Sequence, residues 1–523
     1  MEKGELAIVL HAHLPYVRSA RTGSLEEDWF FQALIECYIP LVRTIQESTF
    51  NKEENPKITI GLSPTLLSLL ENKDLCHRFS DWTKKRILLL KKVPQEQKKA
   101  ATHLENFFED QLIFWESVNH DLIKCFARLW ELKVIDLLTC AATHGYLPLL
   151  REHPETVFGQ LKTAVREHSR IFGSNPHGIW LPECAYYEGL DKLMNKAGLK
   201  YAVLDGHGIL NSEPRPRYGL YAPICTSNGV AFFGRDSEST LPVWSAKDGY
   251  PGNPVYREFH RDLGWDMPIE ELSTLNIKEP RPLGLKLHKV TGRNVSLNKK
   301  YIYDPKDAEQ KAKQDSIDYL KGRIKQLDNL KKAMKIGPVL IAPFDAELFG
   351  HWWFEGPIFL AEIFSQSRKL GIKLTRLCDI LNKGRQIQLC NPSPSSWGRG
   401  GYHDYWLNES NSWVIPKWSK AGKIFVNICT EKSHSYYQKR LLKQAAIELL
   451  LSQASDWSFI LRAGTTVEIA KARIDSHLNK FWYLINLIEK DNYNENHLIS
   501  IENEDNIFPS INYKDWSSIK NYF

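Results

Sequence analysis

The chain has 523 residues, of which 43% are hydrophobic and 25% charged, a composition typical of a folded protein and not of a disordered one. Its 68 basic and 62 acidic residues leave a net charge of +6, which is too small for this length to indicate nucleic-acid binding. A chain of this length exceeds one ordinary core, so we expect a barrel-sized unit with one or two smaller units.

Nine cysteines, none of them in a CxxC pair, predict reduced thiols in a cytoplasmic protein. The N-terminal segment has no basic region before its short apolar run, so we expect no signal peptide. No apolar stretch approaches the length of a membrane span, so we expect no membrane partner. We expect a monomer or a small homo-oligomer.

Short apolar runs, taken in chain order, predict six buried strands. They span residues 5–10, 57–62, 134–142, 178–182, 201–205 and 338–344. Continuous apolar runs of this length are typical of parallel strands that are covered on both faces. Amphipathic helices are predicted over 96–131 and 306–335. Strands that alternate with helices indicate an α/β fold.

Two stretches rich in Pro and Gly or Ser interrupt this pattern. Residues 206–256 are expected to form an insertion above the strands, and residues 386–403 a linker. Helices are predicted again over 433–490, while the polar tail over 491–508 is predicted to be loosely ordered.

Side chains that could act as acids, bases or metal ligands directly follow the predicted strands. They are His11 and His13, His144, Glu183, His207 and Asp345. Because parallel strands bring their carboxyl ends to one edge, such groups are typical of an α/β enzyme with its site at that edge.

Two of these groups are carboxylates with aromatic neighbours. Glu183 follows Trp180, and Asp345 opens a segment that contains Glu347 and Trp352. Non-catalytic explanations are a buried glutamate bonded to backbone N–H groups and an aspartate that caps a helix. Apolar surroundings raise a carboxyl pKa and keep a proton available near neutrality, so either Asp345 or Glu347 could act as a general acid. Two carboxylates about 5–5.5 Å apart would suit retaining cleavage of a glycosidic bond, with the aromatic rings stacking on sugar.

The histidines allow a second hypothesis. His11 and His13 form an HxH pattern on one face of a strand. Together with His144, His207 and Asp345 they could bind the metal of a hydrolase. Alternatively, they hydrogen-bond substrate hydroxyls or shape a pocket, and the local motif leaves both readings open.

Further candidates have ordinary structural explanations beside the functional ones. Tyr250 lies in a Tyr-Pro-Gly turn, which is either a plain turn or a lid over a site. Trp397 and Trp406 lie in a glycine-rich stretch and either pack in a core or stack on sugar. Asp456 and Thr465 lie near predicted helix ends, where capping is the default role.

Eight motifs, in this order along the chain, resemble glycoside hydrolase family 57, and within it the 1,4-α-glucan branching enzymes. They read LHAHLPYVR, THGYLPLL, GIWLPECAY, GYPGNPVYREFHRDLGWD, KLHKVTG, PFDAELFGHWWFEGP, SSWGRGGYHDYWLN and ASDWSFI. The resemblance spans nearly the whole chain. It implies a distorted, incomplete (β/α)7 TIM-like barrel with a small inserted domain and an α-helical C-terminal domain. The implied boundaries are 1–187 and 249–385 for the two parts of the barrel, 188–248 for the insertion and 386–523 for the helical domain.

The resemblance also implies roles for single residues. Glu183 would be the retaining nucleophile, and Asp345, rather than Glu347, the acid/base. The family needs no metal and no cofactor, which makes the histidines pocket residues around the sugar. The implied substrate contacts and stacking rings are His11, His13, His144, Trp180, Arg261, Gly284, Trp352, Trp397, Trp406 and Asp456. Thr465 stands where a glutamine is expected, which puts one substrate hydrogen bond, but not the reaction, in question.

The activity that this resemblance implies is α-1,4 to α-1,6 transfer on an α-glucan polymer such as amylose, glycogen or starch. Transfer requires that water be excluded while a sugar acceptor is positioned. The alternatives are an α-amylase-like hydrolase or a 4-α-glucanotransferase of the same family. A metal-dependent hydrolase and a non-catalytic glucan-binding protein are more distant ones.

Overall fold

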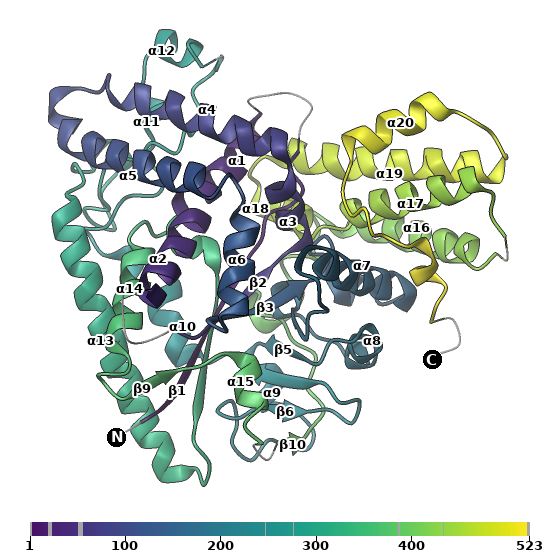
Figure 1. Cartoon of the computed structure of the whole chain (residues 1–523), viewed down its shortest axis with the longest axis horizontal. Helices are drawn as coiled ribbons and strands as arrows, with labels where there is room; N and C mark the ends of the chain where they lie inside the picture. The colour runs from purple at the N-terminus through teal and green to yellow at the C-terminus, as the bar shows by residue number, and fades with distance from the viewer. Residues whose placement is uncertain are drawn as a thin grey trace.

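An open, curled α/β sheet and a bundle of C-terminal helices make up the protein (Figure 1). The computed structural model describes residues 3–18, 24–50, 56–245, 247–275, 277–384, 387–431 and 433–519. Figure 1 shows the bundle, with α16, α17, α19 and α20, on one side of the sheet. The predicted combination of an incomplete barrel with a helical C-terminal region is confirmed.

Within the described residues the sheet has ten strands. They are β1 (Gly4–Ala12), β2 (Ile58–Leu62), β3 (Ile135–Cys140), β4 (Gly178–Trp180), β5 (Tyr201–Leu204), β6 (Ile224–Cys225), β7 (Ala231–Gly234), β8 (Val339–Asp345), β9 (Ile372–Leu374) and β10 (Gln388–Leu389). Their order is β10-β6-β7-β5-β4-β3-β2-β1-β8, and β9 also pairs with β1. All pairs are parallel except β6 with β7. All six strands predicted from apolar runs are therefore confirmed.

Strand β1 lies inside the sheet, and all nine of its residues are buried. Its parallel register places His11 opposite Gly61 on β2 and opposite Asp345 on β8. Since the strands run the same way, their carboxyl ends meet at one edge, as the sequence predicted.

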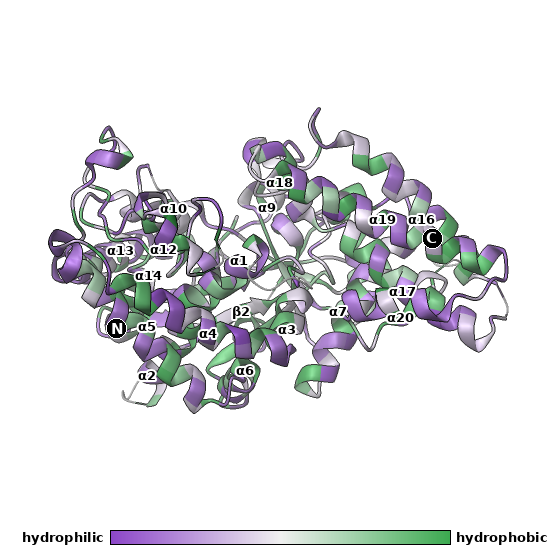
Figure 2. Cartoon of the chain, turned by 90° about the horizontal axis from the view of Figure 1, so that it is seen from above, coloured by the Kyte–Doolittle hydropathy of each residue, from purple (hydrophilic) through white to green (hydrophobic). Residues whose placement is uncertain are grey.

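Helices pack against the sheet. The longer ones in the first part of the chain are α1 (Leu25–Ala33), α2 (Ile39–Phe50), α3 (Pro64–Glu71), α4 (Lys73–Leu90), α5 (Lys98–Ser117), α6 (Leu122–Glu131) and α7 (Pro154–Phe172). They are followed by α8 (Leu190–Ala197), α10 (Ser237–Trp244), α13 (Pro305–Ala333) and α14 (Gly356–Gln366). Outer helices such as α5 and α13 carry both hydrophilic and hydrophobic residues along their length, as Figure 2 shows, which is typical of amphipathic helices on a core.

The two predicted helices differ in outcome. Helix α13 confirms the prediction over 306–335, and the Asp304 side chain caps its N-terminus. The prediction of one helix over 96–131 is wrong, because α5 and α6 are separate there. Asn119 and His120 adopt positive φ angles between them, which a continuous helix does not allow, and Asp121 caps α6.

The range 188–248, predicted as an inserted domain, contributes β5, β6 and β7 to the sheet. Its other elements are α8, the short α9 (Gly206–Leu210) and α10. The segment between α10 and α13 has only short helices, among them α11 (Leu263–Asp266) and α12 (Ile269–Ser273). Figure 1 shows both near the top of the molecule. The division into a barrel in two parts, an inserted domain and a helical C-terminal domain stays a prediction.

The C-terminal bundle confirms the predicted helices, but the predicted loose tail is wrong. Its helices are α16 (Ile415–Cys429), α17 (Tyr436–Ser452), α18 (Ser455–Ala463), α19 (Val467–Glu489) and α20 (Glu495–Glu504). Helix α20 lies within the tail. Leu498, Ile501 and Phe508 are buried there, so a few apolar residues among many polar ones are enough to fix the segment. In the part of the chain that is described, no helix is both long and apolar enough to span a bilayer.

Trp516 anchors the end of the described chain to the α/β part. Its side chain is fully buried against α7, where a Cβ added to Gly159 would lie 2.3 Å from the indole ring. Its ring also meets Phe425 of α16 edge-on, with 5.3 Å between ring centroids. The adjacent Asp515 accepts two hydrogen bonds from the Arg166 guanidinium, both at 3.0 Å.

We expect Trp516→Ala to lower the free energy of unfolding by about 3–5 kcal/mol, because it opens a large cavity between α7 and α16. The matched control is Trp265→Ala, whose ring is 55% exposed and whose replacement should cost less than about 0.5 kcal/mol. Thermal unfolding followed by circular dichroism measures both. Equal melting temperatures for the two variants would contradict the anchoring role.

Candidate active site

A cavity of about 490 Å³ lies at the carboxyl edge of the sheet. The α/β part contributes His11, His13, His144, Glu183, Asp345, Glu347 and Trp352 to its lining. The C-terminal region contributes Asp456 of α18 and Thr465, which lies between α18 and α19. The structure thus brings both predicted carboxylates into one cavity. It also shows that the helical bundle forms part of the wall.

Glu183 lies in a single helical turn, η4 (Pro182–Cys184), directly after β4. Its φ of 61° and the φ of 51° at Cys184 are both left-handed, and such strain is found at functional sites. The Trp397 backbone N–H donates to the Glu183 carbonyl at 3.0 Å, and the Trp397 indole N–H donates to Glu183 Oε2 at 2.6 Å. Trp397 therefore fixes both the backbone of Glu183 and one of its carboxylate oxygens, Oε2.

Burial raises the pKa of Glu183 to about 7, and the hydrogen bond from Trp397 opposes this rise. The charge of Asp456 adds to the rise, while His13 opposes it. The ionised form of Glu183, which a nucleophile needs, thus depends on the indole donor.

Asp345 ends β8 and is only partly exposed. Burial raises its pKa well above the usual value, and the negative charges of Glu347 and Glu183 raise it further, while Arg235 opposes them. Asp345 does not cap the turn η7 (Ala346–Leu348) through its side chain, which removes the capping explanation. A protonated carboxyl group beside a more readily ionised one is the arrangement that an acid and a nucleophile require. The spacing of about 5–5.5 Å stays a prediction.

Four rings form a continuous stack beside these carboxylates. Trp180 stacks on His11 at 4.8 Å, His11 on His144 at 5.1 Å, and His144 on His13 at 4.1 Å, with interplanar angles of 8°, 18° and 12°. Burial lowers the pKa of His11 and of His144 well below the usual value. Both rings are therefore neutral near neutral pH, and the stack adds no positive charge at its centre.

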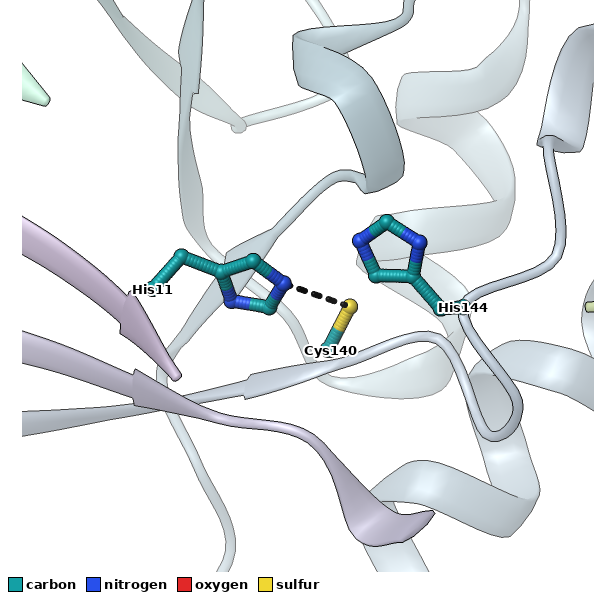
Figure 3. A group of neighbouring side chains, drawn as sticks. All are labelled: His11, Cys140 and His144. Atoms are coloured by element: carbon teal, nitrogen blue, oxygen red, sulfur yellow. Dashed lines mark hydrogen bonds between the residues drawn. The ribbon is translucent and has the colours of Figure 1, made fainter. Parts of the chain in front are cut away.

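The stack does not favour the metal-site hypothesis. Figure 3 shows His11, Cys140 and His144, where Cys140 Sγ lies 4.0 Å from His11 Nε2. This set and the set of His13, His144 and Asp456 each have ligand atoms within 4.8 Å of one another. Stacked imidazoles, however, hold their in-plane lone pairs in nearly parallel planes, whereas tetrahedral coordination requires lone pairs that converge on one point.

His207, the other histidine of that hypothesis, lies apart from the stack. Its Nδ1 is 2.9 Å from Asp205 Oδ1, and its Nε2 is 2.9 Å from the Gly401 carbonyl. Neither His207 nor Asp345 belongs to a possible metal group among the described residues.

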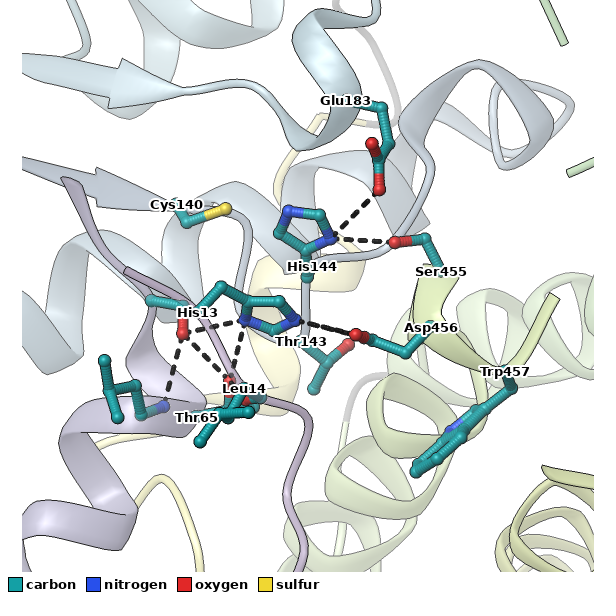
Figure 4. A network of polar contacts seen from close by, with 12 residues as sticks. His13, Leu14, Thr65, Cys140, Thr143, His144, Glu183, Ser455, Asp456 and Trp457 are labelled. Carbon is teal, nitrogen blue, oxygen red and sulfur yellow. Dashed lines mark hydrogen bonds and ion pairs between the residues drawn. The ribbon is translucent and has the colours of Figure 1, made fainter. Parts of the chain in front are cut away.

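His13 links the sheet to the C-terminal helices (Figure 4). Its Nε2 lies 3.0 Å from Asp456 Oδ2 on α18, and its Nδ1 lies 2.9 Å from Ser63 Oγ after β2. The charge and hydrogen bond of His13 lower the pKa of Asp456 despite its burial. His144 Nδ1 lies 2.7 Å from Ser455 Oγ and 3.9 Å from Glu183 Oε1. Asp456 is therefore an ionised part of the wall.

Other predicted substrate contacts lie in or beside the cavity. Trp352 lines it with 42% of its surface exposed, and Thr465 is exposed at its rim. Trp180 and Trp406 are buried: Trp180 carries the histidine stack, and Trp406 stacks on Tyr146 at 4.4 Å. A direct sugar contact by either buried ring stays a prediction.

Three further predicted residues are also outside the lining. Arg261 pairs with Asp266 at 3.2 Å, as an ordinary ion pair. Gly284 has a φ of +78°, and a Cβ there would lie 3.0 Å from the side chain of Gln32, which does line the cavity. Tyr250 donates to Asp318 of α13 at 2.8 Å, so the hydroxyl of the predicted lid is tied to a helix in this structure. Their predicted roles remain predictions.

Sequence reasoning missed other residues of the site. Trp29, His351 and Phe459 line the cavity, while Ser63 and Ser455 orient the histidine rings. Ser63 directly follows the predicted strand 57–62, so the rule of strand ends was sufficient to find it. Phe459 lies in the motif ASDWSFI, three residues after Asp456, so this motif was a signal that could have found it.

Residues 7–390 match the model of glycosyl hydrolase family 57. The chain belongs to glycosyl hydrolase family 57. Residues 417–516 match a second model, described as the C-terminal part of 1,4-alpha-glucan branching enzyme. The predicted family is thereby confirmed across both parts of the chain.

Relatives of known structure align along nearly the whole chain. The α-amylase AmyC of Thermotoga maritima has a TM-score of 0.91 at 33% identity, covering 99% of both chains. A family 57 branching enzyme of Pyrococcus horikoshii has a TM-score of 0.89 at 28% identity, covering 99% of this chain and 97% of that one. A 1,4-alpha-glucan branching enzyme of Thermococcus kodakarensis is 29% identical and covers 92% of this chain and 74% of that protein.

We expect Trp397→Phe to move the acidic limb of the pH–rate profile upward by about 1 pH unit. Glu183 must be ionised to act, so the rate rises as pH passes its pKa, and loss of the indole donor raises that pKa further. The profile of kcat/KM on a maltooligosaccharide measures the shift. Trp406→Phe is the matched control, because the indole N–H of Trp406 has no hydrogen-bond partner among the described residues. Identical acidic limbs in the two variants would contradict the prediction.

Proposed function

We propose that the chain is a 1,4-α-glucan branching enzyme that uses Glu183 as nucleophile and Asp345 as acid/base. One observation carries the proposal: these two carboxylates share a cavity whose wall is completed by Asp456 and Thr465. Both completing residues lie within the segment that matches the C-terminal part of branching enzymes. The donor is a glucan such as amylose, starch or glycogen.

In the first step Glu183 Oε1 attacks C1 of an α-1,4-linked glucose, and Asp345 gives its proton to the departing O4. A covalent glycosyl-enzyme and a shortened chain result. In the second step Asp345 takes the proton from the 6-hydroxyl of another glucan segment, whose oxygen displaces Glu183 from C1. The product is an α-1,6 branch, and both carboxyl groups regain their starting protonation.

Transfer rather than hydrolysis depends on which molecule reaches the glycosyl-enzyme. The aromatic side chains of Trp29, Trp352 and Phe459 line the cavity and offer apolar faces to sugar rings. A bound acceptor chain on these rings would displace water from the reacting carbon.

A second candidate is an α-amylase with the same two carboxylates. The likeness to AmyC, whose fold agrees over 99% of the chain at 33% identity, favours this alternative. The two activities differ in the acceptor alone, which is water in one and a 6-hydroxyl in the other.

Linear amylose separates the two candidates. Reducing ends are measured in the reaction mixture before and after treatment with a debranching enzyme. We expect few new reducing ends before debranching and many after it, because each transfer places the C1 end of the transferred segment in an α-1,6 linkage. An immediate rise with no further gain on debranching would identify a hydrolase and overturn the branching proposal.

We expect Glu183→Gln to lower turnover on amylose by about 10⁴-fold or more, because the amide cannot form the glycosyl-enzyme. The control is Glu188→Gln, the same change at an exposed position five residues further along the chain. Melting temperatures confirm that both variants fold. Substantial residual turnover in the folded Glu183→Gln variant would remove Glu183 from the role of nucleophile.

A further inference from the structure

A π-helical turn faces the segment that follows the acid/base. This turn, η1 (Leu34–Tyr38), joins α1 to α2. Its Glu36 side chain lies 2.7 Å from His351 Nδ1, and its Tyr38 hydroxyl donates to Glu347 Oε1 at 2.5 Å. π-Helical turns are rare and occur frequently at functional sites. The turn therefore holds the segment that carries Asp345 at more than one point.

Glu347 and Asp345 differ in their hydrogen-bond donors. Glu347 Oε1 accepts the Tyr38 hydroxyl at 2.5 Å and the His13 backbone N–H at 3.1 Å. Among the described residues, no group donates a hydrogen bond to the Asp345 carboxylate. Glu347 is also nearly inaccessible, with 7% of its surface exposed. Both donors stabilise the ionised form of Glu347, and Asp345 lacks an equivalent.

Two carboxyl groups in one buried site rarely ionise together, because their charges repel at low dielectric. A single shared proton then resides on the group whose anion has fewer donors, which is Asp345. The other charged groups that face Asp345 are Glu183 and Asp456, which also disfavour its anion, and Arg235, which favours it. Burial raises the pKa of Glu347 as well, but Tyr38 and His13 oppose that rise.

We propose that Glu347 is a positioning residue whose ionised carboxylate, fixed by Tyr38 and the His13 backbone, keeps the catalytic proton on Asp345. This inference rests on the proposed role of Asp345 as the acid/base. Glu347 itself does not need to touch the substrate. Its neighbours on η1 are the buried thiol of Cys37, which donates to the Ala346 carbonyl at 3.0 Å, and the Tyr38 hydroxyl. Burial raises the pKa of both groups, so Glu347 is the anion of this contact.

The test is the pH dependence of kcat/KM on amylose for Glu347→Gln. Asp345 acts in its protonated form, so the rate falls as pH rises through its pKa. Removal of the neighbouring negative charge lowers that pKa, and we expect the alkaline limb to move down by about 1 pH unit or more. Tyr38→Phe should move the alkaline limb in the same direction by less, because loss of the hydroxyl donor destabilises the ionised form of Glu347 but leaves its carboxyl group in place.

The matched control is Glu355→Gln. Glu355 is also fully buried, and its Oε1 accepts a tyrosine hydroxyl (Tyr303, 2.6 Å) and a backbone N–H (Arg257, 3.1 Å). It is not among the main charges that act on Asp345. Its replacement should cost similar stability and leave the position of the alkaline limb unchanged.

A donor that needs no protonation gives a second readout. Fluoride leaves a maltooligosyl fluoride without a proton, so the glycosylation rate of Glu347→Gln on this donor should equal that of the unmodified enzyme. A uniform fall in rate at every pH and on both donors would show a purely structural role and overturn the inference. Failure of the proposed function itself looks different, because Asp345→Asn would then keep its activity on amylose.

Discussion

The parallel register of β1 with β2 and β8 is the constraint on which the site depends. It places His11 level with Asp345 on one side and with Gly61 on the other. A Cβ at Gly61 would lie 3.3 Å from His11 Nδ1 and 3.4 Å from Trp180 Cβ, so this glycine leaves room for the ring stack. Any slip of β1 by one residue would turn the histidines to the other face of the sheet.

The close packing of side chains at this edge of the sheet also determines the protonation states of the carboxyl groups in the cavity. Four carboxyl groups, Glu183, Asp345, Glu347 and Asp456, line one cavity, and three of them are held by different partners. An indole donor serves Glu183, a hydroxyl and a backbone amide serve Glu347, and an imidazole serves Asp456. Asp345 alone has no such donor among the described residues. Different partners thus give chemically similar groups different protonation states, which is what the two-step reaction requires.

The strand positions and the placing of Glu183 and Asp345 at strand ends were predictable from the sequence, because buried parallel strands are continuous apolar runs and the polar residues of such a site follow them directly. The resemblance to family 57 then distinguished Asp345 from Glu347. Contacts between distant segments were not predictable: Tyr38 reaches Glu347 across 309 positions, and His13 reaches Asp456 across 443. Neither pair leaves a local pattern. The helix in the polar tail was missed because its stability comes from packing on α17 and α19 rather than from its own composition.

The contribution of α18 to the cavity has a consequence for synthesis on the ribosome. Asp345 and Glu183 are translated long before Asp456, and domains fold largely in the order in which they emerge. The sheet can therefore close while the wall opposite His13 is still missing. Trp516, which fixes the bundle against α7, emerges later still. A nascent chain thus carries both reactive carboxylates in a site that is open to water, and only the finished chain encloses them.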